Sequence, residues 1–298
     1  MAFIRGAANL ATHAFIPIKF SKKVAAILDS IVVAMDCVNT EWEDEVLDSG
    51  DIVRIRNFGN INVNSYTVDQ TITNQTVTEQ VQSLVIDQQQ YFSFKIDDVD
   101  VKQTDLDVYD GYEERAAIAV RNTVDTFLLT QMAASAPANN TLGATTAGQV
   151  IQLNPDNIYD VFVDLYERLE TGNVFGATSQ RPWAIVHPKI KAIMKKSGQL
   201  THPTPKGDEV IRNSVVGEFA GFDIKTTTNL PMNQASGGND DNFGVVVGTN
   251  LGYTFAMQIS KTEDLRMETT FADQMRGLFV YGGQAVVPGA LGKLVCKV

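Results

Sequence analysis

The segment FKIDDVDVKQTDLDVYDGYEE at residues 94–114 carries the side chains best able to do chemistry, because eight of the 18 residues from 97 to 114 are acidic. Asp97, Asp98 and Asp100 could hold a divalent metal ion or act as an acid/base catalyst. A metal-dependent hydrolase that uses these three carboxylates is therefore one hypothesis. A calcium loop of the EF-hand type does not fit. Counted from Asp98, the sixth position needs glycine but holds Gln103.

The same carboxylates also have a structural interpretation. Residues 97–100 end a predicted strand, and Asp105, Asp107 and Asp110 lie in or near the first turns of a long predicted helix. Acidic side chains interact favourably with the positive end of a helix dipole. We expect this structural role. We therefore assign no catalytic residue, no metal ligand and no cofactor, and we do not expect an enzyme.

The rest of the chain offers little further chemistry. It has no phosphate-binding loop, no dinucleotide fingerprint and no nucleophile elbow. Its three histidines are His13, His187 and His202, and His187 follows a predicted strand, where we expect a turn or capping residue. Cys37 and Cys296 stand near opposite ends of the sequence and make no disulfide framework, so we expect a reducing compartment.

Charge and hydropathy exclude two further classes of protein. The formal net charge is −11, whereas a general DNA- or RNA-binding protein needs a basic face to displace counterions. No stretch reaches the ~18–20 uninterrupted apolar residues of a membrane span. We therefore expect no membrane association and a protein that is made and folded in the cytoplasm.

The elements that would position the acidic segment are a hairpin before it and a helix after it. An arm and a helix over residues 21–47 come first, and residues 51–101 then alternate in the manner of strands. Between these strands the Thr- and Gln-rich stretch TVDQTITNQTVTEQVQS has strand propensity but few residues that can build a core. We predict that it forms a long β-hairpin projecting from the body.

A helix over residues 105–134 is predicted next, and at 1.5 Å per residue it would be about 45 Å long, which fits a structural spine. Residues 131–155 carry no charge and are predicted to form a loop or hinge. A second region opens with a helix that has Asn154 as its cap and Pro155 in its first turn. The buried strand RPWAIVHP, the helix PKIKAIMKKSG and several closing strands follow, so the fold class is α+β.

This order of parts resembles the major capsid proteins of tailed bacteriophages, which have the Hong Kong 97-type fold. The most specific stretches are LVIDQQQYFSFKIDDVD and GEFAGFDIKTTTNLP, and the resemblance runs from about residue 15 to the end of the chain. The parts that it implies are an N-terminal arm and helix at 1–50, an E-loop β-hairpin at 51–95, a P-domain with the spine helix at 96–153, an A-domain at 154–255, and return strands to the P-domain at 256–298.

The function implied by the resemblance is self-assembly into an icosahedral phage head that encloses packaged double-stranded DNA without sequence-specific binding. The implied partners are further copies of the chain in pentamers and hexamers, a portal and a separate scaffolding protein, with a decoration protein left open. The implied location is the virion, after assembly in the host bacterial cytoplasm. Other interpretations are an encapsulin-type shell around a cargo enzyme, a tail-tube subunit, and the hydrolase named above.

A hairpin without a core of its own gains contacts when it lies on a neighbouring subunit. The residues that we expect at such contacts lie in the hairpin and in the acidic segment. They are Arg54, Arg56, Thr71, Thr73, Gln75, Thr76, Thr78, Asp97, Asp98 and Asp100. Arg54 and Arg56 are the candidate basic partners for the acids of an adjacent subunit.

The sequence departs from one pattern of this family. Some members weld the shell with a Lys–Asn isopeptide bond whose lysine lies on the E-loop, but no lysine occurs here between Lys23 and Lys95. We therefore predict that this cross-link does not form. Some relatives also carry a cleaved N-terminal scaffolding segment, whereas the arm here starts almost at Met1, so we expect a separate scaffolding protein.

Overall fold

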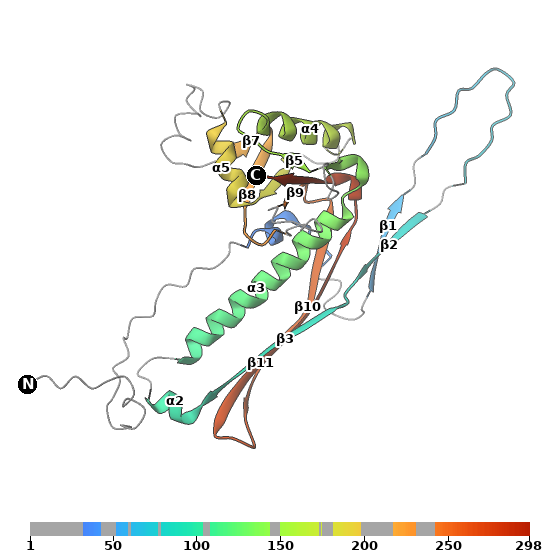
Figure 1. Cartoon of the computed structure of the whole chain (residues 1–298). Helices are drawn as coiled ribbons and strands as arrows, with labels where there is room; N and C mark the ends of the chain where they lie inside the picture. The colour runs from blue at the N-terminus through green and yellow to red at the C-terminus, as the bar shows by residue number, and fades with distance from the viewer. Residues whose placement is uncertain are drawn as a thin grey trace, which may run out of the picture.

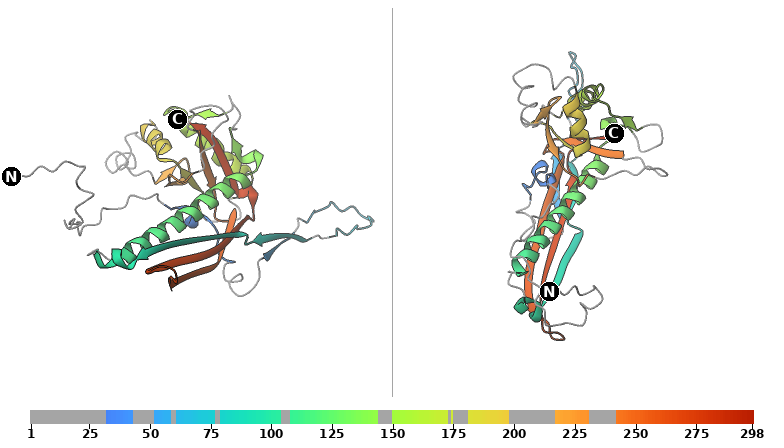
Figure 2. Two further views of the ribbon diagram at one scale, coloured as in Figure 1. Left: turned by 60° about the horizontal axis from the view of Figure 1, so that its bottom comes forward. Right: turned by 60° about the vertical axis from the view of Figure 1, so that its left-hand side comes forward.

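The structure is a computed structural model, and it describes residues 32–42, 52–58, 61–76, 79–103, 108–143, 150–172, 174, 181–197, 217–230 and 242–298. Three parts are visible in Figure 1: a long helix lying along three long strands, a smaller unit of helices and short strands, and a hairpin that projects away from both. The two further views in Figure 2 show the same elongated arrangement.

The long part is an antiparallel sheet covered by one helix. Its strands are β10 (Tyr253–Arg266), β11 (Ala272–Ala285) and β3 (Gln88–Asp97), in the order β10-β11-β3. Burial alternates along β3 as predicted, with Phe92, Phe94 and Ile96 on the more buried face. The ring of Phe94 lies 5.8 Å from that of Tyr112 on the covering helix, measured between centroids, so this face packs against the helix.

The covering helix is α3 (Val108–Ser135), which confirms the predicted spine. Its buried side chains gather in its second half, at Val124, Leu128, Leu129 and Met132. They pack with Phe255, Phe279 and Tyr281 of the long strands in the largest core of the molecule. Most of the residues from 111 to 123 are exposed or half-buried, so the helix is anchored chiefly by its C-terminal half.

The smaller unit is built on a mixed seven-stranded sheet with two buried faces. Its strands are β4 (Thr141–Leu142), β12 (Leu291–Lys297), β9 (Asn242–Gly248), β6 (Trp183–Val186), β8 (Phe222–Thr226) and β7 (Glu218–Phe219), with β5 (Ile151–Gln152) paired to β12. All of β6 is buried, as its apolar sequence predicts. Trp183 and Ile185 enter the core beneath α3, and Ala184 and Val186 enter a second core.

The second core lies under two helices, α4 (Ile158–Thr171) and α5 (Pro188–Lys196). The predicted cap at Asn154 is wrong, because Pro155–Asn157 forms a turn and α4 begins at Ile158. The capping role predicted for His187 is confirmed. It precedes α5, and its Nδ1 accepts a hydrogen bond from the backbone N–H of Lys189 at 3.2 Å.

The projecting hairpin is rooted by β1 (Ile52–Phe58) and β2 (Glu79–Val85), which pair antiparallel. A third, small core forms where this root meets the long sheet, and it contains Leu84, Ile86 and Val280. Gly282 of β11 allows this close crossing, because a Cβ atom there would lie 2.2 Å from the carbonyl oxygen of Val85.

Some predicted elements differ from the structure. Most of the helix predicted at 21–47 falls outside the described residues, but its described part holds only the 3₁₀ turn η2 (Ala34–Cys37). Asn39 then forms a β-bridge with Thr254, so the chain has left the helix by that point. Residues 131–135 continue α3 instead of starting a loop, and two further short 3₁₀ turns, η3 (Ala138–Asn140) and η5 (Pro288–Ala290), precede β4 and β12.

The last predicted segment, residues 256–298, divides between the two sheets. This segment contains most of β10 and all of β11, and both strands lie in the long sheet. It also contains β12, which pairs with β9 in the seven-stranded sheet. Its burial explains this, since Leu294 and Cys296 fill the core beneath α4. Cys37 and Cys296 are both free and buried in different cores, and burial raises the pKa of each thiol to about 12. No helix in the described ranges is long and apolar enough to cross a membrane.

Candidate assembly site

The distal part of the hairpin, residues 61–76, is exposed along its whole length. It was predicted as a β-ladder, but the structure assigns no strand between 61 and 76. The segment closes on itself through side chains instead. Gln75 Oε1 accepts from the backbone N–H of Asn62 at 2.9 Å, and Gln70 Oε1 accepts from that of Thr67 at 3.1 Å. Asp69 turns the chain with φ at 69°, a left-handed conformation that Asp tolerates.

Large apolar side chains point into solvent along this segment. Val63 is 97% exposed and Val68 is 88% exposed, and Ile61, Tyr66 and Ile72 are exposed as well. These apolar residues were not among the predicted contact residues, which were polar in this segment, although the alternation in INVNSYTV was a signal for them. Contiguous exposed apolar side chains on a soluble protein mark interaction sites.

The polar residues predicted for subunit contact lie on the same projection. Thr71, Thr73, Gln75 and Thr76 are exposed in the distal segment, whereas Thr78 lies outside the described residues. Arg54 and Arg56 are exposed on β1 of the root, opposite Ser83 and Val81 of β2. All the described members of this group are therefore accessible to a neighbouring molecule.

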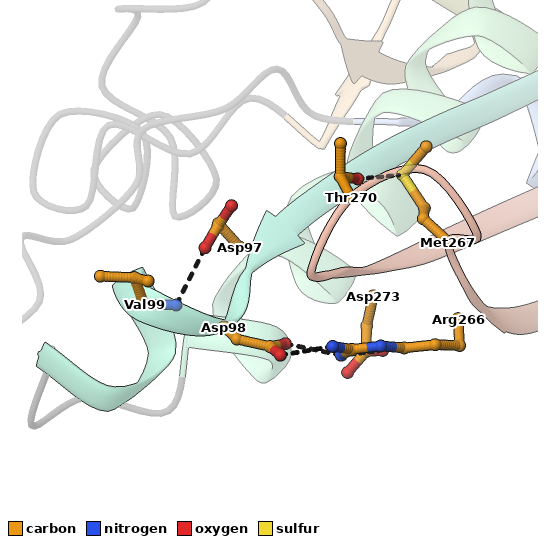
Figure 3. A network of polar contacts seen from close by, with 7 residues as sticks. All are labelled: Asp97, Asp98, Val99, Arg266, Met267, Thr270 and Asp273. Carbon is orange, nitrogen blue, oxygen red and sulfur yellow. Dashed lines mark hydrogen bonds and ion pairs between the residues drawn. The ribbon is translucent and has the colours of Figure 1, made fainter.

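Within the subunit, the acidic junction is held by Arg266, and the contact with Arg54 or Arg56 of an adjacent subunit stays a prediction. Strand β3 ends at Asp97, and Asp98 begins the short helix α2 (Asp98–Gln103), which was not predicted. Arg266, at the end of β10, donates to both carboxylate oxygens of Asp98, and its Nη1 is 2.6 Å from Asp98 Oδ1 (Figure 3). The same nitrogen lies 2.9 Å from Asp273 Oδ1, so one guanidinium bridges two carboxylates.

Backbone contacts complete the junction. Asp97 Oδ1 accepts from the N–H of Val99 at 2.9 Å at the start of α2, and the N–H of Asp98 donates to the carbonyl of Phe271 at 3.0 Å. Hydrogen bonds from Arg266 lower the pKa of Asp98. Farther along the hairpin formed by β10 and β11, hydrogen bonds from Lys261 and then from Arg276 lower the pKa of Glu263 to about 2. The Arg266–Asp98 pair therefore joins α2 to the β10–β11 hairpin, and the pair of Arg276 with Glu263 joins β10 to β11.

Two described carboxylates of the junction, Asp97 and Asp98, each have a partner within the chain. Asp98 accepts hydrogen bonds from Arg266, and Asp97 accepts one from the backbone N–H of Val99. Asp100 lies in α2, and its side chain is outside the described part of the structure. Within the described ranges, no three His, Cys, Asp or Glu side chains form a group that could hold a metal ion. Sequence reasoning missed Arg266 because its partner, Asp98, is 168 residues away along the chain.

A buried carboxylate joins the N-terminal segment to the body. Asp125 of α3 has no exposed surface, and its Oδ1 accepts from the backbone N–H groups of Val33 at 3.0 Å and Ala34 at 2.8 Å. Its Oδ2 accepts from Asn229 Nδ2 at 2.9 Å, just after β8. One side chain therefore connects the N-terminal segment, the spine helix and the smaller unit, a role that no local pattern in the sequence predicts.

Comparisons of the chain with known proteins agree with this arrangement. Residues 80–293 match the family described as phage capsid protein. No curated protein matches the chain in sequence.

Several solved structures share the fold. A structure of Mycobacterium phage Che8 aligns with a TM-score of 0.80 at 21% identity, over 95% of this chain and 98% of that one. The capsid of cyanophage P-SCSP1u gives 0.71 at 15% identity, over 95% and 93% of the two chains. The capsid of Ralstonia phage GP4 gives 0.67 at 10% identity, over 100% and 98%.

Proposed function

The chain belongs to the phage capsid protein family, and on that premise we propose that the projecting hairpin holds neighbouring copies together in an icosahedral head. The protein is a major capsid protein with the α+β Hong Kong 97-type fold. The observation that carries the proposal about the hairpin is the exposed apolar surface of residues 61–76. It has no partner within the described part of its own subunit, and a second copy is the partner that a shell supplies.

The free energy gained when a neighbouring subunit buries these apolar side chains favours assembly. Burying one Val or Ile side chain contributes about 1.5–3 kcal/mol. Val63, Val68 and Ile72 are each at least 75% exposed, so most of that contribution is still available when a neighbour covers them. A shell repeats the contact once per subunit, so a modest gain at each hairpin adds up over the particle.

The named parts of the family fold are assigned here as proposals. Residues 51–95 are the E-loop, residues 96–153 hold the spine helix of the P-domain, and residues 154–255 form most of the A-domain. Because β12 pairs with β9, we assign β12 to the A-domain, although residues 256–298 were expected to return to the P-domain. Arg54, Arg56 and the described threonines of the distal segment are proposed to contact the neighbour together with the apolar side chains.

The partners beyond the chain itself are also proposals. Pentamers and hexamers, a separate scaffolding protein, a portal and packaged double-stranded DNA follow from a tailed-phage head, with assembly in the host cytoplasm. The net charge of −11 suits a container that encloses DNA without binding its sequence. The proposal does not include a decoration protein. The role is structural, and the encapsulin and hydrolase alternatives are not favoured by the family match.

Paired substitutions in the hairpin test the proposal. In a V63D/V68D variant, both side chains are exposed, so the subunit should keep its circular dichroism spectrum and thermal unfolding temperature. Closed shells counted by negative-stain electron microscopy should fall at least tenfold. N64D is the control for the effect of charge, because it adds one negative charge to the same exposed segment without removing an apolar side chain.

The outcomes distinguish a failure of the hairpin's proposed role from a failure of the capsid function. Loss of shells in V63D/V68D with normal shells in N64D supports the proposed role of the hairpin. Equal shell yield from V63D/V68D and the unaltered chain rules it out. If the unaltered chain, expressed with the other head genes of its phage, forms no capsomers or shells, the capsid function itself is wrong.

A further inference from the structure

Helix α4 presents an acidic face on the outside of the smaller unit. Its inner stripe, Ile158, Phe162, Leu165 and Leu169, is buried in the core. Its outer face carries four exposed carboxylates at three- and four-residue spacing, which are Asp160, Asp164, Glu167 and Glu170. The basic residue of this helix, Arg168, donates from Nη1 to the carbonyl oxygen of Asn139 at 2.7 Å and so turns toward the chain's own backbone.

The C-terminal end of this acidic face borders a hollow. The space has a volume of about 540 Å³, and Asp164, Glu167, Arg168 and Thr171 of α4 line it together with Asn139, whose carbonyl oxygen accepts from Arg168. The last carbonyl groups of a helix also carry partial negative charge, which attracts cations. A hollow bordered by carboxylates at a helix C-terminus is suited to a cationic side chain.

Helix α5 presents the opposite charge. Its nine residues include four lysines and no acid, and the exposed or half-buried lysines are Lys189, Lys191, Lys195 and Lys196. Burial, and then the neighbouring charge of Lys195, lower the pKa of Lys191, so these like charges are held close together. In the described residues, Lys191, Lys195 and Lys196 form no ion pair with any acid, the carboxylates of α4 included.

The two helices belong to one layer but present different sides of the unit. Both cover the same core on the seven-stranded sheet. In Figure 1, α4 crosses the top of this unit and α5 lies along its left side, and the two helices contact each other. Each subunit therefore offers an acidic surface and a basic surface on neighbouring helices, and within the described residues no ion pair joins Lys191, Lys195 or Lys196 to the carboxylates of α4.

A closed ring of identical subunits needs two different surfaces on each subunit that are complementary to each other. Around a five- or six-fold axis each contact is heterologous, because one surface of a subunit meets a different surface of the next. Opposite charges on the two surfaces favour this register, and they disfavour a two-fold contact that would place like charges together.

We propose that, within a capsomer, the acidic surface of α4 and its hollow receive the lysines of α5 from the adjacent copy of this chain. The inference rests on the proposed capsid function and names the pair of surfaces that sets the rotational register. Lys191 and Lys195 enter beside Asp164 and Glu167. The contact is electrostatic, so raised salt weakens it.

Charge reversal on each surface, separately and together, tests the pairing. K191E/K195E and D164K/E167K should each reduce the yield of capsomers and shells at least tenfold at low salt, with unchanged circular dichroism. The chain with all four substitutions has complementary surfaces again and should recover assembly. R115E/R121E is the control for the net charge of K191E/K195E, because it makes the same charge change at exposed positions of α3, outside the A-domain and the E-loop. Should a reversed variant lose its fold, K191Q/K195Q and D164N/E167Q remove the charges more gently.

Each outcome has one meaning. Loss in both double variants and recovery in the fourfold variant supports the pairing of α4 with α5. Normal assembly of either double variant, or no recovery in the fourfold variant with its fold intact, overturns the pairing and leaves the capsid function standing. Failure of the unaltered chain to form capsomers under the conditions given above overturns the capsid function instead.

Discussion

Asp125 of α3 accepts a hydrogen bond of 2.8 Å from the backbone N–H of Ala34, which lies 91 residues earlier in the chain. The same oxygen accepts from Val33, and the other oxygen accepts from Asn229. The carboxylate has no exposed surface, so these three donors take the place of water. The spine helix thus holds the N-terminal segment and the smaller unit through one side chain.

Removal of this carboxylate should loosen the N-terminal segment. D125A leaves two backbone donors and the Asn229 amide without their acceptor, and each unmet donor costs about 1–3 kcal/mol when buried. We expect a loss of about 2–5 kcal/mol in the free energy of unfolding of the unassembled subunit, measured with urea.

D36A is the matched control for this prediction. Asp36 lies in the same segment, but its side chain is 75% exposed and its ion pair with Lys225 spans 3.4 Å. An exposed pair of this kind contributes about 0–1 kcal/mol. Equal unfolding midpoints for D125A and D36A would contradict the role assigned to Asp125.

Gly282 should not tolerate even a methyl group. A Cβ atom there would lie 2.2 Å from the Val85 carbonyl oxygen and 2.7 Å from the Ile86 Cα, and both are backbone atoms of the hairpin root. G282A should therefore displace β2 and destabilise the subunit by about 1–3 kcal/mol, as overpacking does. Thermal unfolding and hydrogen exchange in β1 and β2 measure this effect.

G111A is the control with the opposite sign. Gly111 lies within α3, and a Cβ atom there meets no atom within 4 Å. Alanine in an open helical position is expected to stabilise the subunit by about 0.5–1 kcal/mol. An unchanged G282A variant would show that the hairpin root does not depend on this close crossing.

Acid should release the junction between α2 and the β10–β11 hairpin. Because Arg266 lowers the pKa of folded Asp98, the folded subunit binds this proton more weakly than the unfolded chain does. The stabilisation is therefore fully present above the unfolded pKa of about 4 and disappears as the pH falls through the lower, folded value. The effect is small because these groups are exposed.

Comparison of the unaltered chain with R266Q isolates this effect. The difference between their thermal unfolding temperatures should be largest near pH 5 and should shrink as the pH approaches 2. A difference that stays constant over this range would mean that the Asp98–Arg266 pair does not contribute to stability.

Mature particles should carry no E-loop isopeptide cross-link. No lysine lies between Lys23 and Lys95, so residues 51–85 of the hairpin contain no amine nucleophile. Denaturing electrophoresis of purified particles should give a single band for the free subunit. A ladder of covalent oligomers, in contrast to the single band of the same sample before maturation, would contradict this expectation.

The sequence by itself determined the kinds of elements and their order. Apolar spacing predicted the spine helix to within three residues at its start, because one continuous helical period extends over its length. Alternation predicted the faces of β3, and the all-apolar run of β6 predicted a strand buried on both sides. These signals are local, so a single sequence carries them.

Only the tertiary structure decided which distant residues meet. Arg266 pairs with Asp98 within the subunit, because the β10–β11 hairpin, 168 residues later in the chain, reaches the end of β3. β12 enters the seven-stranded sheet because it fills a core shared with α4. In the described residues 32–42, the helix predicted over 21–47 is replaced by one 3₁₀ turn that Asp125 holds and by the bridge from Asn39 to Thr254. Such long-range contacts leave no periodic signal in the sequence, because their energy depends on packing between segments far apart in the chain.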